Sequence, residues 1–377
     1  MELFDLKEYL EDLKTICAID SGKHYAPGTN AMAAFFEERF RSLGLKTQIL
    51  RYQDNDFAPF LLASNSDDED IDVIFVAHMD TVFPVGTAED WPFTVDEDGI
   101  GHGPGCVDCK GGCLLVWYLL RAMQKDGGWN FRFRVAFNSD EETLSGYSRS
   151  YFEELAQHAK YCLVFEPGRA KEEFVHHRKG GPSYRIKCHG VPAHSGAEPE
   201  KGANAIVELA RWAVELSALN DYAAGTTVNI ARFHGESKNG AIPDLAEMSV
   251  GARFMTADAR TGLDAVIERM RTTPFDPRTS MEIELVSDRP AMEPHAATQA
   301  LLEQLHAAGE EVGQEVLCIA TGGASDGNFI APFGVATLDG CGPCGASLHT
   351  REEFLLTGSV QRRFVLMRRL LERLFPQ

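Results

Sequence analysis

The sequence predicts an α/β fold in two parts, a layered α/β/α domain and a smaller α+β domain inserted into it. The chain has 377 residues, and single hydrophobic cores stop growing near ~250 to 300 residues, so two domains are expected. Buried-type strands alternate with helical periods from residue 71 to residue 165, which indicates a largely parallel sheet. Residues 183–289 instead follow the order βαββαβ, which is complete in itself and matches a split βαβ sandwich.

The N-terminal segment predicts an amphipathic helix. Leu3, Leu6, Leu10 and Leu13 recur at helical spacing among acidic residues. A signal peptide would need a basic start and an apolar core, so we expect this helix to belong to the mature protein. No apolar run approaches the ~20 residues that cross a bilayer. The odd number of cysteines, nine, indicates reduced thiols and a cytoplasmic location rather than a disulfide framework.

The remaining elements of the layered domain follow in chain order. Runs of apolar, β-branched and aromatic residues predict its strands, and apolar residues at three- and four-residue spacing predict its helices. These elements are a strand at 71–78, a helix at 113–125, a strand at 131–138, a helix at 151–159, strands at 161–167 and 335–340, and a helix at 359–375.

The same patterns predict the elements of the insert. They are a strand at 183–190, a helix at 203–219, strands at 227–235 and 246–254, a helix at 262–271 and a strand at 281–289. We therefore expect a discontinuous first domain made of residues 1–179 and 289–377, with residues 180–288 as the inserted domain.

The charge balance is acidic. Lys and Arg together number 36, Asp and Glu together number 56, and the net charge is −20. This excess of negative charge disfavours nucleic acid or an anionic membrane as a partner, and it suits a soluble or cation-binding protein. The acidic run at 66–70 is expected to be a solvated loop.

Candidate metal ligands stand where the predicted strands end. In an open α/β sheet, ligands gather beyond the carboxyl ends of the strands. The residues at these places are His78 and Asp80, Asp108 on a glycine-rich loop before a helix, Asp140, Glu141 and Glu142, Glu166, and His349 after a late glycine-rich loop.

One such residue alone is more often a turn former or an ordinary hydrogen-bonded group, but five convergent strand ends favour a metal site. Three carboxylates and two imidazoles around two divalent cations leave a charge of about +1, and one hydroxide would neutralise it, which is tolerable for burial. Such ligands suit Zn²⁺, with Co²⁺ or Mn²⁺ as alternatives. Asp80, two positions after His78, is expected to accept the second imidazole N–H and orient the ring.

The motifs HMDTV, GPGCVDCKGG, SDEE and FEPG, followed by the late His349, resemble those of the co-catalytic zinc exopeptidase family. This family includes glutamate carboxypeptidase, succinyl-diaminopimelate desuccinylase, acetylornithine deacetylase, aminoacylase and tripeptidase. The resemblance covers nearly the whole chain and implies a zinc-exopeptidase-like catalytic domain with an inserted lid domain. It also implies that the bond between Asp108 and Cys109 is cis. The implied roles are one zinc held by His78 and Glu166, a second held by Glu142 and His349, Asp108 as the bridge and Glu141 as the general base.

The insert carries further residues that resemble this family. GVPAHSGAEPEKGANAI resembles the lid motif in which a histidine, here His194, stabilises the oxyanion, often across a homodimer interface. Asn229 and Arg253 fall where carboxypeptidase-like members bind the carboxylate and carbonyl of the substrate, and an arginine fork suits a carboxylate. A surface strand residue is the alternative interpretation of Arg253.

The chain also departs from the family pattern. Two glycines that many members have after SDEE are replaced by Leu144 and Tyr147, so the loop beside the base is expected to differ in shape. Two CxxC pairs, Cys106 with Cys109 and Cys341 with Cys344, have the spacing of a four-thiolate structural zinc site. Because the first pair brackets Asp108, we favour free thiols near the site.

The preferred hypothesis is a dinuclear zinc amidohydrolase, similar to glutamate carboxypeptidase, that removes a C-terminal amino acid from a small peptide or N-acyl conjugate. The first alternative is a deacylase of N-acyl amino acids, which shares the whole site and differs on the amine side of the scissile bond. A non-catalytic binding protein of the same fold is the second alternative. Loss of Glu141 or of a ligand would favour it, but all of these residues are present.

Overall fold

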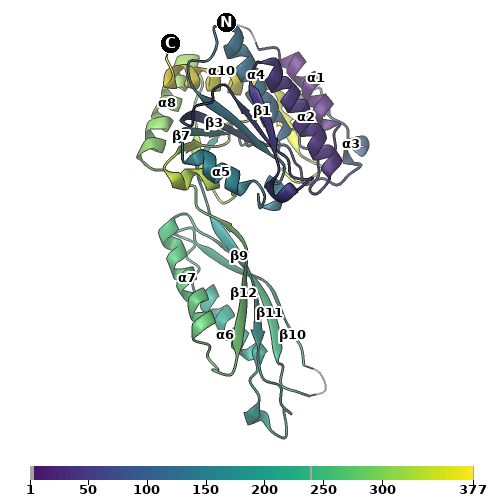
Figure 1. Cartoon of the computed structure of the whole chain (residues 1–377), viewed down its shortest axis with the longest axis vertical. Helices are drawn as coiled ribbons and strands as arrows, with labels where there is room; N and C mark the ends of the chain where they lie inside the picture. Colours follow the sequence, from purple (N-terminus) through teal and green to yellow (C-terminus); the bar gives the residue numbers. More distant parts are fainter. Residues whose placement is uncertain (1–3, 238–239, 377) are drawn as a thin grey trace. The chain divides into compact units, whose positions relative to one another are not determined.

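A computed structural model describes residues 4–237 and 240–376. Contacts divide the chain into two compact units (Figure 1). The first unit contains the chain up to His177, Pro294–Thr321, and the chain from Ser325 onward. The second unit contains Arg178–Glu293 and Gly322–Ala324, and the predicted insert at 180–288 lies within it.

A six-stranded sheet forms the centre of the first unit, in the order β1-β2-β6-β3-β7-β14. The last four of these strands are mutually parallel, as predicted. An antiparallel pair that the sequence patterns did not predict, β1 and β2, extends one edge. The strands are β1 (Lys46–Leu50), β2 (Phe60–Ser64), β6 (Phe133–Asn138), β3 (Ile71–His78), β7 (Ala159–Val164) and β14 (Ala336–Leu338).

Helices cover both faces of this sheet (Figure 1). Val73, Phe75 and Ala77 of β3 pack with the larger group of helices, whereas Ile74 and Val76 pack with the smaller group. Burial on both faces explains why this strand is a continuous apolar run. The larger group is α1 (Leu6–Cys17), α2 (Ala26–Ser42), α4 (Lys110–Lys125), α8 (Ala296–Val312) and α10 (Thr357–Leu374), and the smaller group is α5 (Arg149–Ala156) and α9 (Gly327–Ile330).

Short elements complete the first unit. One small sheet has the order β15-β16-β5-β4, and β8 pairs with β13 in another. Their bounds are β4 (Thr94–Val95), β5 (Ile100–His102), β15 (Gly345–Ala346), β16 (Phe354–Leu356), β8 (Phe174–Arg178) and β13 (Cys318–Thr321). The short helices are α3 (Thr87–Asp90), η1 (Tyr52–Asp54), η2 (Glu141–Thr143) and η4 (Ala331–Phe333).

The second unit has the predicted βαββαβ order. Its antiparallel sheet has the strand order β10-β11-β9-β12. Buried residues of this sheet share one core cluster with residues of both helices, among them Ile186, Trp212 and Ile267. The elements are β9 (Gly181–His189), η3 (Pro199–Lys201), α6 (Ala205–Ser217), β10 (Thr227–Gly235), β11 (Leu245–Arg253), α7 (Ala257–Thr272) and β12 (Ser280–Arg289).

Local side-chain caps fix where several helices begin. The carboxylate of Asp5 accepts the backbone N–H groups of Lys7 and Glu8 at the start of α1. Asn204 does the same for two N–H groups of α6, and Thr256 accepts one N–H of α7. Each cap satisfies donors that have no partner within the helix. Within the described ranges, no helix combines the length and apolar character that crossing a membrane requires.

Glu208 of α6 forms a hydrogen-bonded link within the second unit. Its side chain is buried, with 2% of its surface exposed. It accepts hydrogen bonds from Trp212 Nε1 at 2.8 Å and from the backbone N–H groups of Phe275 at 2.8 Å and Asp276 at 2.9 Å. The carboxylate therefore joins its own helix to the loop between α7 and β12.

Replacing Glu208 by Gln should lower the free energy of unfolding by about 1 to 3 kcal/mol, because an amide N–H₂ would face donors that the carboxylate now accepts. Glu215→Gln on the same helix is the control. Its partly exposed pair with Arg269 should contribute less than about 1 kcal/mol. Urea unfolding followed by circular dichroism would measure both, and equal losses would contradict this role of Glu208.

Candidate metal centre

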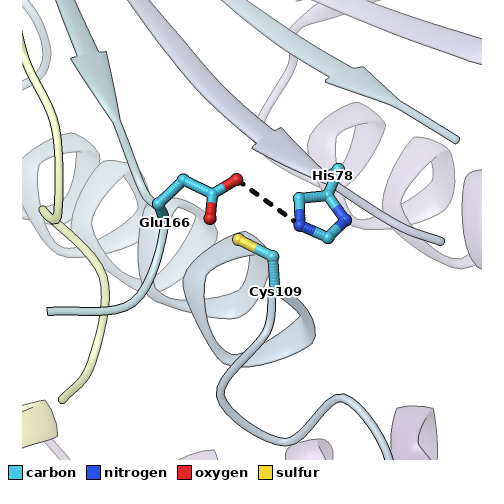
Figure 2. A group of neighbouring side chains, drawn as sticks. All are labelled: His78, Cys109 and Glu166. Atoms are coloured by element: carbon cyan, nitrogen blue, oxygen red, sulfur yellow. Dashed lines mark ion pairs between the residues drawn. The ribbon is translucent and has the colours of Figure 1, made fainter. Parts of the chain in front are cut away.

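His78 stands at the carboxyl end of β3, at the centre of the predicted ligand cluster. Its side chain is 1% exposed. Its Nε2 lies 3.1 Å from Asp108 Oδ1 and 3.4 Å from Glu166 Oε1. Glu166 follows β7, the strand beside β3, and Figure 2 shows its carboxylate facing the imidazole. Two adjacent parallel strands thus deliver an imidazole and a carboxylate to the same point.

Asp108 lies between the two histidines. Its Oδ1 faces His78, and its Oδ2 lies 3.3 Å from His349 Nε2. The peptide bond between Asp108 and Cys109 is cis, as the family resemblance implied. Burial alone would raise the pKa of this carboxyl group, but hydrogen bonds from His349 and His78 hold it below its ordinary value. Each oxygen of one carboxylate therefore serves a different half of the cluster.

Glu142 and His349 form the second half. His349 Nε2 lies 3.3 Å from Glu142 Oε1. Glu142 belongs to η2, just after β6, whereas His349 lies in the loop between β15 and β16. Hydrogen bonds with Asp108 and Glu142 raise the pKa of His349 to about 10. The late histidine therefore reaches the sheet edge from a loop rather than from the end of a central strand.

The donor set fits divalent metal ions. Ligand atoms of His78, Asp108 and Glu142 lie within 4.8 Å of one another. Burial raises the pKa of Glu166 well above its ordinary value and outweighs the lowering by His78, while the charge of Asp108 raises it further. Cations placed between these carboxylates would remove that repulsion, and imidazole with carboxylate is the donor combination that Zn²⁺ accepts.

Asp80 faces the second imidazole nitrogen, as expected, and it also contacts the next strand end. His78 Nδ1 lies 3.0 Å from the backbone carbonyl oxygen of Asp80 and 3.4 Å from its carboxylate. The carboxylate also accepts the backbone N–H groups of Glu141 at 3.3 Å and Glu142 at 3.0 Å. Asp80 therefore orients the imidazole, while its side chain fixes the turn that carries the two glutamates.

The described residues form two groups of potential metal ligands: His78 with Asp108 and Glu142, and His78 with Cys109 and Glu166. Glu141 is next to Glu142 in the sequence but belongs to neither group. It is partly exposed and shares η2 with Glu142. Leu144, which replaces a family glycine, has a left-handed φ of 75° and is 50% exposed. Tyr147 packs edge to face against Phe57. Both replacements therefore lie on the loop that follows the two glutamates.

Glu353 is a site residue that sequence analysis missed. It is fully buried and accepts the backbone N–H groups of Gly105 at 3.2 Å, Val107 at 3.0 Å and Asp108 at 3.1 Å. Burial and the nearby charge of Asp108 raise its pKa to about 7, against the lowering by these N–H groups. Glu353 therefore holds the loop that presents Asp108. Glu353 directly follows Glu352 in the sequence, and the two residues differ only in the structure, where Glu353 is buried and Glu352 is exposed.

All nine cysteines are free. Cys109 Sγ belongs to a group with His78 and Glu166 (Figure 2), whereas Cys106, Cys341 and Cys344 belong to neither group of potential ligands. Cys106 Sγ lies 3.8 Å from the carbonyl oxygen of Gly101, and Cys344 Sγ lies 3.4 Å from Arg363 Nε. In the part of the chain that the structure describes, the two CxxC pairs therefore build no four-thiolate cluster.

The two substrate-binding candidates, Asn229 and Arg253, and the expected oxyanion stabiliser His194 lie in the second unit. Asn229 of β10 pairs with Gly251, and Arg253 of β11 pairs with Thr227. In this antiparallel register, Asn229 and Arg253 are diagonal neighbours on one face of the sheet, and both are exposed. The exposed His194 accepts the backbone N–H groups of Gly196 at 3.2 Å and Ala197 at 3.0 Å through Nδ1. In a neutral ring, its Nε2 therefore carries the proton.

An α/β sheet with imidazole and carboxylate groups clustered at its strand ends is suited to a metal-dependent hydrolase. Within this class, the chain belongs to Peptidase family M20/M25/M40, which matches residues 74–373. It is a metal-dependent hydrolase of the peptidase and acyl-amino acid hydrolase type.

Known relatives agree with this placement. The chain is 26% identical to carboxypeptidase G2 of Pseudomonas sp. strain RS-16, over 96% of this chain and 88% of the relative. It is 30% identical to succinyl-diaminopimelate desuccinylase of Burkholderia cenocepacia strain HI2424, over 80% of this chain and 82% of the relative.

Solved structures share the fold. Aminopeptidase PepT of Bacillus cereus matches with a TM-score of 0.78 and 20% identity, over 99% of this chain and 100% of that one. The metallo-carboxypeptidase Sso-CP2 of Sulfolobus solfataricus matches with a TM-score of 0.72 and 16% identity, over 99% of this chain and 100% of that one. These matches confirm the predicted fold class.

Replacing Glu353 by Gln should weaken zinc binding by about 10- to 100-fold, because the loop that presents Asp108 would lose an acceptor. Glu352→Gln is the matched control, since Glu352 is adjacent and exposed, and it should bind zinc as the unchanged chain does. Competition with a chromophoric chelator would measure both affinities. Equal affinities for the two variants would refute the supporting role of Glu353.

Proposed function

We propose that this chain is a dinuclear zinc peptidase that hydrolyses the amide bond before a C-terminal amino acid of a small peptide or N-acyl conjugate. The observation that carries the proposal is the position of Asp108, with one oxygen facing His78 and the other facing His349. A carboxylate divided in this way is suited to bridge two ions. Co²⁺ or Mn²⁺ are alternatives to zinc by ligand type.

The proposed assignment of ligands follows the two halves of the cluster. His78 and Glu166 would hold one ion, Glu142 and His349 would hold the other, and Asp108 would be shared. Two bound zinc ions would polarise the scissile carbonyl and lower the pKa of a water molecule. Glu141 then accepts the proton of that water and passes it to the leaving amine. Its place beside Glu142 supports this role, because Asp80 fixes the backbone of both residues.

The second unit supplies the proposed substrate contacts. His194 has its Nε2–H available to donate to the oxyanion, since its Nδ1 is occupied as an acceptor. Arg253 and Asn229 share an exposed sheet face and are proposed to bind the free carboxylate and the carbonyl of the substrate. In this proposal, residues 180–288 act as a lid and as the contact of a homodimer, and the enzyme is cytoplasmic.

The alternative within the same chemistry is a deacylase of N-acyl amino acids. The desuccinylase relatives support this alternative, while the longer match to carboxypeptidase G2 supports a carboxypeptidase. Arg253 suits both, because both substrates end in a free carboxylate. Metal analysis together with a panel of substrates for hydrolysis would distinguish the carboxypeptidase from the deacylase. The panel contains dipeptides with C-terminal Glu, Ala and Phe beside N-acetyl and N-succinyl amino acids. Absence of bound metal and of turnover would instead favour a non-catalytic binding protein.

Replacing Glu141 by Gln should lower kcat by at least ~10²-fold while two metal ions per chain are retained, because only the proton acceptor is lost. Asp108→Asn should lose both metal and activity, because the shared ligand is weakened on both sides. Metal analysis and initial rates on the same preparations separate the two effects. A near-normal kcat for Glu141→Gln would show that another group is the base.

Replacing Arg253 by Ala should raise KM about 10- to 100-fold for substrates with a free C-terminal carboxylate, since a charge-assisted hydrogen bond would be lost. Substrates with an amidated C-terminus should show no such change. The control is Arg232→Ala, which replaces an exposed arginine on the neighbouring strand β10 and should leave KM unchanged. Steady-state kinetics would test this, and an equal rise in KM for amidated substrates would argue against carboxylate recognition.

A further inference from the structure

Leu144 is an exposed apolar residue on the loop that follows the two glutamates, and the function proposed above does not use it. It is 50% exposed, and among the described residues it belongs to none of the apolar core clusters. Its backbone has a left-handed φ of 75°, a conformation that strains a leucine but not a glycine. Neither core packing nor the backbone conformation therefore accounts for a leucine at this position.

Hydrogen bonds hold this loop beside the proposed base. The backbone N–H of Leu144 donates to the carbonyl oxygen of Glu141 at 2.9 Å and closes the turn that also carries Glu142. Further along the loop, the backbone N–H of Tyr147 donates to Asp140 Oδ2 at 2.7 Å. Asp140 is buried and directly precedes Glu141. The exposed side chain of Leu144 is therefore held beside the turn of the proposed base.

Aromatic rings support the same loop. Tyr147 packs edge to face against Phe57, with ring centroids 5.4 Å apart, and Phe57 packs in the same way against His24 at 4.7 Å. Edge-to-face contact is a favoured geometry for such rings. Tyr147 and Phe57 are partly exposed. These ring contacts add to the hydrogen bonds that hold the loop, and they leave apolar surface on it.

The charged groups next to the loop disfavour an anionic substrate group there. Glu141 and Glu142 lie on the N-terminal side of Leu144. Arg149, the first basic residue after the loop, pairs with Glu153 at 2.7 Å. Because like charges placed together are unfavourable, an apolar group matches this surface better than a carboxylate does.

We propose that Leu144 contacts the acyl side of the scissile amide, so that the enzyme selects substrates with an apolar acyl group or side chain on that side. This inference rests on the proposed function, in which Arg253 binds the carboxylate of the amino acid that leaves. The group on the other side of the bond remains for the loop beside Glu141. Contact with Leu144 would remove apolar surface from water on both partners, which favours a large apolar group over acetyl or succinyl.

The competing interpretation is a leucine that serves only the structure of the loop. Its replacement would then lower stability and slow the cleavage of all substrates alike. Under our proposal, Leu144→Gly relieves the left-handed backbone and removes exposed apolar surface. The thermal unfolding midpoint should therefore not fall, while the selectivity for the acyl group is lost.

The test uses the full zinc-loaded chain and the N-acetyl, N-hexanoyl and N-succinyl derivatives of one amino acid, the one that the substrate panel identifies. We expect wild-type kcat/KM to be about 10-fold or more higher for N-hexanoyl than for the other two. Leu144→Gly and Leu144→Ala should lower it for N-hexanoyl to the N-acetyl level and change it for N-acetyl less than about threefold. Leu144→Ala keeps the left-handed backbone strained, so it separates loss of the contact from added loop flexibility. Val365→Ala, which shortens an exposed apolar side chain on α10, is the control and should change none of these rates.

Two results would overturn the inference while leaving the proposed function intact. One is a wild type that cleaves N-acetyl or N-succinyl substrates as well as N-hexanoyl ones, which requires no variant to fold. The other is an equal loss of kcat/KM for all three substrates in both Leu144 variants. A wild type without metal-dependent cleavage of any substrate would contradict the proposed function itself, and the inference with it.

Discussion

The carboxylate of Asp108 is shared between two imidazoles, and the rest of the site is arranged around this sharing. A buried carboxylate is costly unless it is paired. Glu142 and Glu166 lie in the same cluster, and burial raises the pKa of each. The two histidines compensate part of this negative charge, and cations placed among these groups would compensate the rest. The net charge of the cluster therefore selects a cation-binding role over an ordinary polar core.

The scaffold meets this constraint through strand register. His78 of β3 is level with Asn138 of β6, and Val76 of β3 is level with Val164 of β7. The three parallel strands thus end close to one another, and the residues that follow them emerge at one edge. The loop of Asp108 arrives at the same edge, where the buried Glu353 holds its backbone.

Much of this arrangement could be predicted from the sequence because it depends on local patterns. The apolar run before His78 and the βαββαβ order of the insert are visible as periodicity. The β1–β2 pair was missed, and neither strand gives a strong local pattern: β1 has exposed and half-buried residues only, and β2 is five residues long. Contacts between distant segments leave no local signal, so the sequence could not separate Glu353 from Glu352, nor show that the carboxylate of Asp80 also holds the backbone of η2.

The measurement that tests the account most directly is a crystal structure of the zinc-loaded protein with anomalous scattering at the zinc edge. The account predicts two peaks, one near His78 and Glu166 and one near Glu142 and His349, with an oxygen of Asp108 coordinated to each. A single peak, or two peaks of which one lacks Asp108 as a ligand, would contradict the shared carboxylate on which the proposed function depends.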